Sequence, residues 1–357
     1  MAEVTICGKK VGDGHPTFII AEAGSNHNRD VDIGCKLVDM SADAGADAVK
    51  FQTYSAELSF STRTTVPLHY RERCGFDETA NMCDLMKYVE LSREQHFPIV
   101  EHCKKRDIPF FSSVFDMSDV DFLEENFAPE SYKIASYEIS HFPLLKRVAE
   151  TGKSLVLSTG MASLGEVEKA LDTLSQNGLT EVVLLHCISN YPAQPEDSNL
   201  RAIHTLQSAF GLPVGLSDHS TGVDVAKTAI AIGACMIEKH ITLDPKMPGP
   251  DQPFSIDPDE LKALVDGARF VETVLGSAHK GCTVAEEGMR SLARRSVVAD
   301  VEIPAGTRIT PEMLVIRRPG TGLHPSNLDT AIGSVARRDI LFNEPLQWDM
   351  LIDREDG

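Results

Sequence analysis

The chain has 357 residues, of which 42% are hydrophobic and 24% charged, and this ordinary globular composition excludes a disordered, collagen-like or low-complexity protein. No apolar run approaches the roughly 18 residues that a membrane helix needs, so a transmembrane protein is excluded as well. The formal net charge of −19 argues against a nucleic-acid partner, and a small anionic ligand would need local Lys, Arg or a metal.

Residues 1–10 contain no basic segment followed by an apolar one, so nothing there predicts secretion. The cysteines are scattered and form neither a CxxC pair nor zinc-finger spacing. We therefore expect a cytoplasmic protein whose cysteines are buried, reduced thiols. They are Cys7, Cys35, Cys74, Cys83, Cys103, Cys187, Cys235 and Cys282.

Short β-like runs recur along the first part of the chain, each followed by a segment that can form a helix. The runs are apolar through their middle, as strands buried on both faces should be. The alternation favours an α/β TIM (β/α)8 barrel over residues 1–280 rather than a doubly wound sheet, and no GxGxxG follows the first run. The runs are 18–24, 48–54, 109–115, 131–136, 154–159, 182–189, 214–218 and 235–242.

The intervening segments carry helix signals. Residues 31–44 have apolar side chains at helical spacing and stop at Gly45, and residues 164–178 behave similarly. Asp257 followed by Pro258 is typical of the start of a last helix. Residues 55–92 are too long for one βα loop, so we expect an excursion over the top of the barrel, where active sites lie.

The C-terminal part differs from the rest of the chain in composition and in its predicted elements. A polar linker is predicted at 281–291, and residues 292–357 combine short strands with Pro, Ala and Gly turns. We expect a small β-rich domain there.

Polar side chains gather at the ends of the predicted barrel strands. Lys50 and Lys133 lie inside apolar runs, where an unpaired ammonium is costly, so two of them together indicate an anionic ligand. A Schiff-base lysine is the competing interpretation. The hydroxyls of Ser158, Thr159, Ser189 and Ser217, also at strand ends, suit a phosphate better.

His219 and His240 follow successive strands and can meet at the barrel mouth. A pair of neutral imidazoles with open positions suits Mn²⁺, Fe²⁺ or Zn²⁺, although hydrogen-bonded polar residues remain the alternative. Glu22, Glu138 and Asp251 are candidates for acid–base work or for binding sugar hydroxyls. Asp251 stands in a Pro/Gly-stiffened loop, and a solvated surface acid is the alternative there.

These residues lie in motifs that resemble the sialic acid synthase (N-acetylneuraminate synthase) family, which includes legionaminic acid, pseudaminic acid and spore-coat polysaccharide synthases. The C-terminal VVADVEIPAGTRITPEMLVIRRPGTGLHP resembles the antifreeze-like (SAF) domain of these enzymes. The motifs, in chain order, are FIIAEAGSNHN, GADAVKFQ, YKIASYE, LSTGM, LHCISNYPAQPEDSNL, GLSDHSTG, IEKHITLD and PGPDQPFS.

The resemblance implies condensation of phosphoenolpyruvate with an N-acetylated hexosamine, N-acetylmannosamine or a related 2,4-diacetamido sugar, to a nine-carbon 2-keto sugar acid and phosphate. It implies a divalent metal, most simply Mn²⁺, at His219 and His240. It further implies a homodimer in which each SAF domain lies over the partner's barrel and Arg318 reaches the sugar's acylamino group.

The remaining implied roles fall into three sets. Phosphoenolpyruvate contacts match Lys50, Lys133, Ser136, Ser158, Ser189 and Ser217, with Thr159 beside them; sugar contacts match Glu22, Gln52, Tyr191 and Asp251; proton or water handling matches Glu138. Glu22, Glu138, Lys50 and Lys133 are thereby the catalytic candidates. Two other functions stay open: a phosphoenolpyruvate-dependent synthase of shorter 3-deoxy sugar acids, and a non-catalytic carbohydrate-binding protein.

Overall fold

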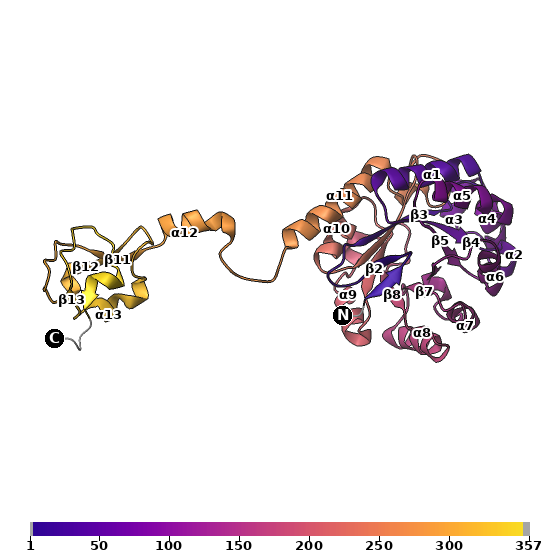
Figure 1. The fold of residues 1–357 in the computed structure, drawn as a ribbon. Helices are drawn as coiled ribbons and strands as arrows, with labels where there is room; N and C mark the ends of the chain where they lie inside the picture. The colour runs from indigo at the N-terminus through magenta and orange to yellow at the C-terminus, as the bar shows by residue number, and fades with distance from the viewer. Residues whose placement is uncertain (1–2, 353–357) are drawn as a thin grey trace. The chain divides into compact units, whose positions relative to one another are not determined.

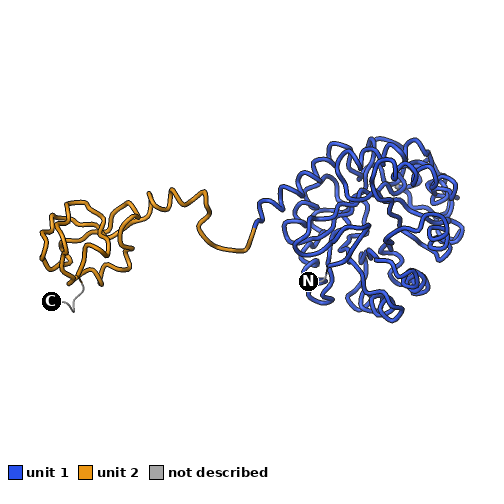
Figure 2. Tube along the Cα trace, viewed as in Figure 1, with its two compact units in different colours: residues 1–276 blue, residues 277–357 orange. Residues whose placement is uncertain are grey.

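The computed structural model describes residues 3–352, and the chain divides into two compact units, residues 1–276 and 277–357 (Figure 2). None of the helices in the described part of the chain has the length and apolarity needed to cross a membrane.

Unit 1 is a closed barrel of parallel strands surrounded by helices, which confirms the predicted TIM barrel (Figure 1). The strands follow one another around the barrel in chain order, as right-handed βα connections require. One predicted strand, 131–136, stops early because a 3-10 turn begins at Ser136. The strands are β3 (Phe18–Gly24), β4 (Ala48–Thr53), β5 (Phe110–Val114), β6 (Ser131–Ile134), β7 (Ser154–Ser158), β8 (Val182–Cys187), β9 (Val214–Asp218) and β10 (Met236–His240).

Capping residues set the ends of helices in the outer layer. In α1 the Asp30 carboxylate accepts the first backbone N–H groups, and Gly45 ends the helix with a φ of 84°. In α11, Asp257 and Glu260 form a capping box around Pro258. The helices are α1 (Val31–Ala44), α5 (Arg93–Lys105), α6 (Met117–Asn126), α7 (Phe142–Ala149), α8 (Leu164–Gln176), α9 (Ala202–Phe210), α10 (Asp224–Ala231) and α11 (Pro258–Leu275).

A two-stranded hairpin that the sequence analysis missed, β1 (Val4–Ile6) and β2 (Lys9–Val11), precedes the barrel. Its buried Val4, Ile6 and Val11 pack with the first residues of barrel strands, among them Phe18 and Met236. The hairpin thus closes the barrel at the end opposite the carboxyl ends of the strands.

The predicted excursion between β4 and α5 consists of three short helices, α2 (Ala56–Ser59), α3 (Leu68–Cys74) and α4 (Met82–Val89). It has two small apolar cores of its own, one around Tyr54, Ala56 and Cys83 and one around Val66, Ala80 and Leu85. These cores hold the excursion in a defined shape.

Unit 2 has a separate apolar core, and its last five residues, 353–357, lie outside the described chain. Helix α12 begins within the stretch predicted as a linker, 281–291, and Thr283 and Glu286 form a capping box just before it. The elements are α12 (Glu287–Ala293), β11 (Ser296–Ala299), β12 (Leu314–Arg317), α13 (Leu328–Ala331), β13 (Val335–Ala336) and β14 (Leu351–Ile352).

The cysteines are free thiols, but the prediction that all are buried is wrong. Cys282 is exposed, four others are partly buried, and Cys83, Cys103 and Cys187 are fully buried. Cys282 belongs to unit 2, precedes α12 and is not part of the apolar core of that unit.

Candidate active site

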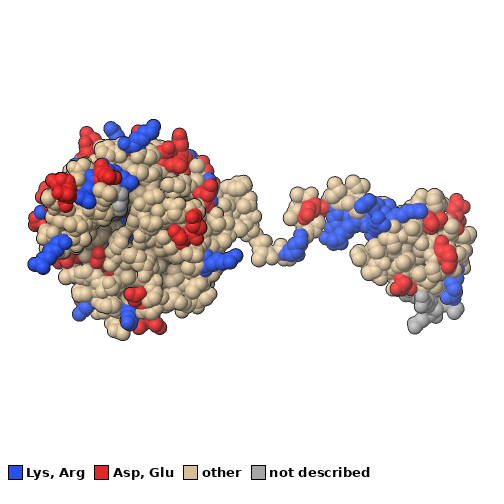
Figure 3. Space-filling model, turned by 180° about the vertical axis from the view of Figure 1, so that it is seen from behind, with Lys and Arg blue, Asp and Glu red and all other residues tan. Residues whose placement is uncertain are grey.

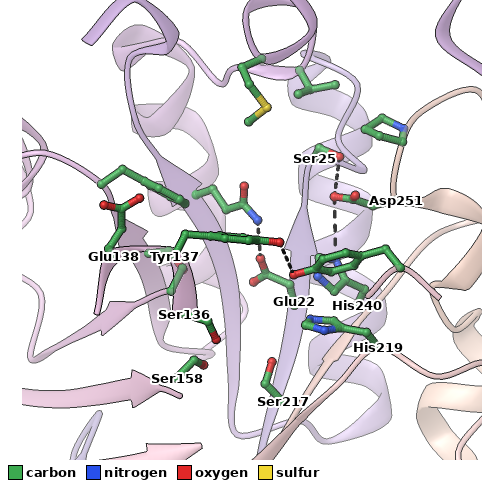
Figure 4. Close-up of a pocket in the computed structure, with 18 of the residues that line it drawn as sticks. Glu22, Ser25, Ser136, Tyr137, Glu138, Ser158, Ser217, His219, His240 and Asp251 are labelled. Atoms are coloured by element: carbon green, nitrogen blue, oxygen red, sulfur yellow. Dashed lines mark hydrogen bonds and ion pairs between the residues drawn. The ribbon is translucent and has the colours of Figure 1, made fainter. Parts of the chain in front are cut away.

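A cavity of about 430 Å³ opens at the carboxyl ends of the barrel strands (Figure 4). The structure brings together here most of the side chains that the sequence singles out, because parallel strands present their ends at one face. They are Glu22, Lys50, Gln52, Lys133, Ser136, Glu138, Ser158, Tyr191, Ser217, His219, His240 and Asp251.

Three of the predicted site residues are not among the lining residues. Thr159 donates its hydroxyl to the Leu185 carbonyl oxygen, and the Ser189 hydroxyl lies against Gly160, where an added Cβ would be 2.4 Å from it. Arg318 belongs to unit 2 and is described below.

Four buried ionisable groups and their hydroxyl partners form what we call the charged floor: Lys50, Lys133, Glu22, Glu238, Ser113, Ser158 and Ser217. Lys50 Nζ lies 2.9 Å from Glu22 and 3.5 Å from Glu238, and donates to Ser113 Oγ at 2.8 Å. Lys133 Nζ donates to Ser158 Oγ at 2.7 Å, and Ser217 donates to Glu238 at 3.0 Å. Each buried charge therefore has a partner, as burial demands.

The pKa values of the floor follow from burial and pairing. Burial raises the pKa of Glu22 to about 7 despite Lys50, and lowers that of Lys133 to about 8. Burial would also lower the pKa of Lys50, but Glu22 and Glu238 outweigh it, so the value is raised. For Glu238, Lys133 and Lys50 outweigh burial and lower the pKa. Lys50 and Glu238 thus stay charged, while Glu22 and Lys133 can exchange protons near neutral pH.

The two histidines meet as the sequence suggested, with ring centroids 5.5 Å apart. His219 Nδ1 donates to the Ile188 carbonyl at 2.9 Å, which leaves its Nε2 lone pair available. His240 Nδ1 is buried without a hydrogen-bond partner, and Asp251 Oδ2 lies 3.9 Å away. Burial holds the pKa of His240 well below its usual range, so the ring is neutral. A neutral imidazole with an unsatisfied nitrogen is the donor that a divalent metal requires.

The pair fits an open metal site rather than a closed one. Among residues 3–352, no cluster of three or more His, Cys, Asp or Glu side chains is positioned to hold a metal ion. Two imidazoles leave the other coordination positions for substrate and water, as in catalytic sites.

A buried ion pair lies behind the histidines. Lys239 and Asp218 are register partners on β10 and β9, and their side chains pair at 2.7 Å. Because side chains alternate across a strand, Glu238 with Ser217 and His240 with His219 point into the pocket, while Lys239 and Asp218 point away. The ion pair therefore ties together the two strand ends that carry the histidines.

The side of the pocket nearest Asp251 is rich in hydrogen-bonding groups. Ser25 donates to Asp251 at 2.7 Å, and Gln52 donates to Glu22 at 3.0 Å. The Tyr137 hydroxyl donates to the Tyr191 hydroxyl at 2.9 Å across the opening (Figure 4). These convergent donors and acceptors can bind a polyhydroxylated ligand.

Apolar side chains also line the cavity, and we call this set the apolar wall: Phe60, Met82, Leu85, Met86, Val89 and Phe115. All but Phe115 come from the excursion. Sequence reasoning located the excursion but missed the wall, and it also left Glu238, Ser113, Ser25 and Tyr137 outside the predicted site. The signal for Glu238 and Ser113 was present, because both stand near the ends of apolar strands.

In unit 2 the loop that carries Arg318 is fastened to the end of α12. Arg318 Nε donates to the Ala293 carbonyl at 2.7 Å, and Gly320 N donates to the Ser291 carbonyl at 2.8 Å. A Cβ on Gly320 would lie 2.7 Å from Arg294 Cβ, so only glycine permits this approach. The segment predicted as a linker thus helps to shape the Arg318 loop.

Comparisons with known proteins agree with this architecture. Residues 37–280 match the NeuB family model, and residues 294–352 match the SAF domain model. The chain is 41% identical over 345 residues to the N,N'-diacetyllegionaminic acid synthase of Legionella pneumophila, covering 96% of each chain. It is 36% identical over 320 residues to the N-acetylneuraminate-9-phosphate synthase of Mus musculus, covering 88% of this chain and 87% of that one. The crystal structure of the N-acetylneuraminic acid synthetase from Leptospira borgpetersenii, in complex with citrate, superimposes with a TM-score of 0.70 at 35% identity, covering 81% of this chain and 95% of that chain.

Proposed function

This chain belongs to the NeuB family and carries a C-terminal SAF domain, and from that premise we propose that it condenses phosphoenolpyruvate with an N-acylated hexosamine. The products are a nine-carbon 2-keto sugar acid and phosphate. One observation carries the proposal: two buried lysines with hydroxyl partners and two histidines line a single barrel pocket.

The charged floor supplies the phosphoenolpyruvate site. Lys50 and Lys133 provide the positive charge that a phosphate and a carboxylate need, and Ser113, Ser136 and Ser158 add hydroxyl donors around them. Holding the enol carbon close to the sugar makes the condensation effectively unimolecular, which removes much of its entropic barrier. Glu22 and Glu238 would supply the negative charge that stabilises C2 as it becomes cationic.

The sugar lies on the hydrogen-bonding side, next to Gln52, Tyr191 and Asp251. Asp251, whose pKa is raised by burial, can accept from a sugar hydroxyl. Glu138, half-buried and with its pKa also raised by burial, is placed to hold a proton or to orient the water that adds to C2.

The imidazoles of His219 and His240 would hold the divalent metal, for which we propose Mn²⁺. When bound, this ion would act as a Lewis acid toward the sugar aldehyde. Two contacts hold the His219 ring in position. Its Nδ1 donates to the Ile188 carbonyl, and its centroid lies 4.3 Å from that of the Tyr191 ring.

We also propose a homodimer in which the SAF domain of one chain covers the partner's barrel and supplies Arg318 to the acylamino group of the sugar. Basic side chains gather on unit 2 (Figure 3), and their sign suits the acidic chain as a whole. Within this unit Arg318 donates to the Ala293 carbonyl and Arg295 to the Ile316 carbonyl.

The test is phosphate release from phosphoenolpyruvate by the purified full-length protein with Mn²⁺. We expect release only when an N-acylated hexosamine is added and loss of release when the metal is chelated. Release without a sugar, or with a phosphorylated aldose and no N-acyl sugar, would contradict the proposal.

A further inference from the structure

We propose that His96 is a positioning residue whose imidazole closes the neck of the excursion between β4 and α5. The excursion leaves the barrel at Thr53, the last residue of β4, and rejoins it at Ser92, the N-cap of α5, and we call these two residues the neck. The two ring nitrogens of His96 bond one to each of them. The kinetic part of this inference rests on the proposed function, whereas the structural part does not.

The direction of each hydrogen bond follows from the groups around the ring. A carbonyl oxygen only accepts, so His96 Nδ1 carries the proton and donates to the Ser92 carbonyl at 2.8 Å. His96 Nε2 then accepts from the Thr53 hydroxyl at 2.9 Å. Because that hydroxyl has a single hydrogen, Ser112 donates to Thr53 Oγ1 at 2.6 Å. One chain of hydrogen bonds thus runs from β5 through β4 to the start of α5.

The imidazole is held in this position from both sides. It is fully buried, and the rings of Phe110 and Phe122 meet it edge-on with centroids 6.4 Å and 5.5 Å away. Burial lowers the pKa of His96 to about 4, so the ring stays neutral near pH 7 and Nε2 remains an acceptor. His96 is not among the residues that line the cavity, so it can act on a ligand only through other residues.

The excursion depends on the neck more than the strands do. Strands β4 and β5 are paired through their backbones from Val49 with Phe110 to Thr53 with Val114, and this ladder holds the floor residues that they carry. The excursion packs largely on its own two small cores. Loss of the His96 bonds should therefore loosen the excursion and leave the floor in place.

The excursion also contacts the loop for which we propose a sugar contact. Arg73, on α3, donates to the Pro250 carbonyl at 2.7 Å, and Asp251 is the next residue along that loop. Tyr70, on the same helix, lines the cavity. A shift of the excursion would thus reach the sugar side of the cavity rather than the phosphoenolpyruvate contacts of the floor.

The test is hydrogen–deuterium exchange of the purified full-length protein, measured segment by segment by mass spectrometry. His96→Phe keeps a ring of similar size and loses both bonds, so we expect the amides of residues 54–91 to exchange about 10-fold faster, with those of β4 and β5 unchanged. Unchanged exchange in 54–91, or an equal rise in β4 and β5, would overturn the inference.

Ile99→Ala is the matched control for a general loss of stability. Ile99 is as buried as His96 and lies on the same helix, but it packs toward α1, where a Cβ on Gly34 would be 2.8 Å from it. We expect no selective rise of exchange in 54–91 in this variant. A rise as large as that of His96→Phe would show that any weakening of α5 loosens the excursion, and would contradict a specific role for His96.

Three further variants assign the effect to the individual bonds. His96→Asn can keep the bond to Ser92, and His96→Gln can keep an acceptor for Thr53, so each should raise exchange less than His96→Phe does. Thr53→Val, of nearly equal volume, breaks the chain at its centre. Combined with His96→Phe it should add little, because both changes remove the same bond. Fully additive effects would contradict the chain of hydrogen bonds.

Steady-state kinetics separate this inference from the proposed function. In His96→Phe we expect the KM for the sugar to rise about 10-fold with the KM for phosphoenolpyruvate unchanged. An unchanged sugar KM together with faster exchange would contradict the positioning role. If the unaltered protein releases no phosphate, the proposed function is refuted, while the exchange experiment still confirms or overturns the closure of the neck by His96.

Discussion

The floor and the wall of one cavity are built on opposite physical principles. The floor consists of charges that the barrel buries and must therefore pair, at the ends of β3, β4, β6 and β10. The wall consists of apolar side chains that pack on small cores of their own, and all of them but Phe115 come from the excursion between β4 and α5. The difference separates what the barrel scaffold contributes to the cavity, which is paired charge, from what the added segment contributes, which is apolar surface.

The largest effect should come from removing a charge from the floor. Lys50→Met leaves Glu22 and Glu238 without their cation, so we expect a loss of about 3–5 kcal/mol in the free energy of unfolding. Phosphate release should fall about 100- to 1000-fold. Denaturant unfolding and the phosphate assay measure the two effects.

Lys9→Met is the matched control, because Lys9 pairs with Asp47 at the surface of the same unit. It should cost less than about 1 kcal/mol and leave turnover intact. Equal effects of the two substitutions would show that the floor is no more dependent on its charges than the surface.

The second effect concerns the metal ligands. His219→Ala and His240→Ala should each abolish Mn²⁺ binding by the purified protein, measured by electron paramagnetic resonance, and with it metal-dependent turnover. His204→Ala, on the exposed face of α9, should change neither. Full Mn²⁺ affinity in either pocket variant would contradict the assignment of His219 and His240 as metal ligands.

A smaller effect should follow from the ion pair behind the histidines. Asp218→Asn leaves Lys239 buried without a counter-charge and loosens the two strand ends, so we expect Mn²⁺ affinity to drop about 10- to 100-fold. Replacing Lys239 by Gln as well removes the unpaired charge and should restore part of the affinity. If Asp218→Asn binds Mn²⁺ normally, the pair has no positioning role.

The smallest effect tests whether unit 2 contributes to the choice of sugar. Gly320→Ala forces the Arg318 loop away from α12, and we expect kcat/KM for the sugar to fall about 10-fold with the KM for phosphoenolpyruvate unchanged. Gly288→Ala, on the same helix with open space around it, should have no effect. Unchanged sugar kinetics in Gly320→Ala would confine substrate recognition to the barrel unit.

The floor could be predicted from the sequence because the barrel rule places strand ends together. Lys50 and Lys133 stand out as cations in apolar runs, and His219 and His240 follow adjacent strands. Glu238 was visible in the same way, but only the structure shows that Lys50 lies between it and Glu22.

The wall could not be predicted, because residues 55–92 have no single periodicity that says which side chains face the barrel. Met82, Leu85, Met86 and Val89 lie on one helix, and its docking over the cavity is a tertiary contact. The β1–β2 hairpin was not predicted for a related reason. Its strands are three residues long and are stabilised by packing against the first residues of the barrel strands.

The most direct test of the central claim is the mass of the product formed from phosphoenolpyruvate, Mn²⁺ and an N-acylated hexosamine. We expect a single acid whose mass is that of the sugar plus pyruvic acid, formed in equal amount to the released phosphate. Free pyruvate with the sugar unchanged would mean that the floor hydrolyses phosphoenolpyruvate without joining it to anything, and would contradict the account.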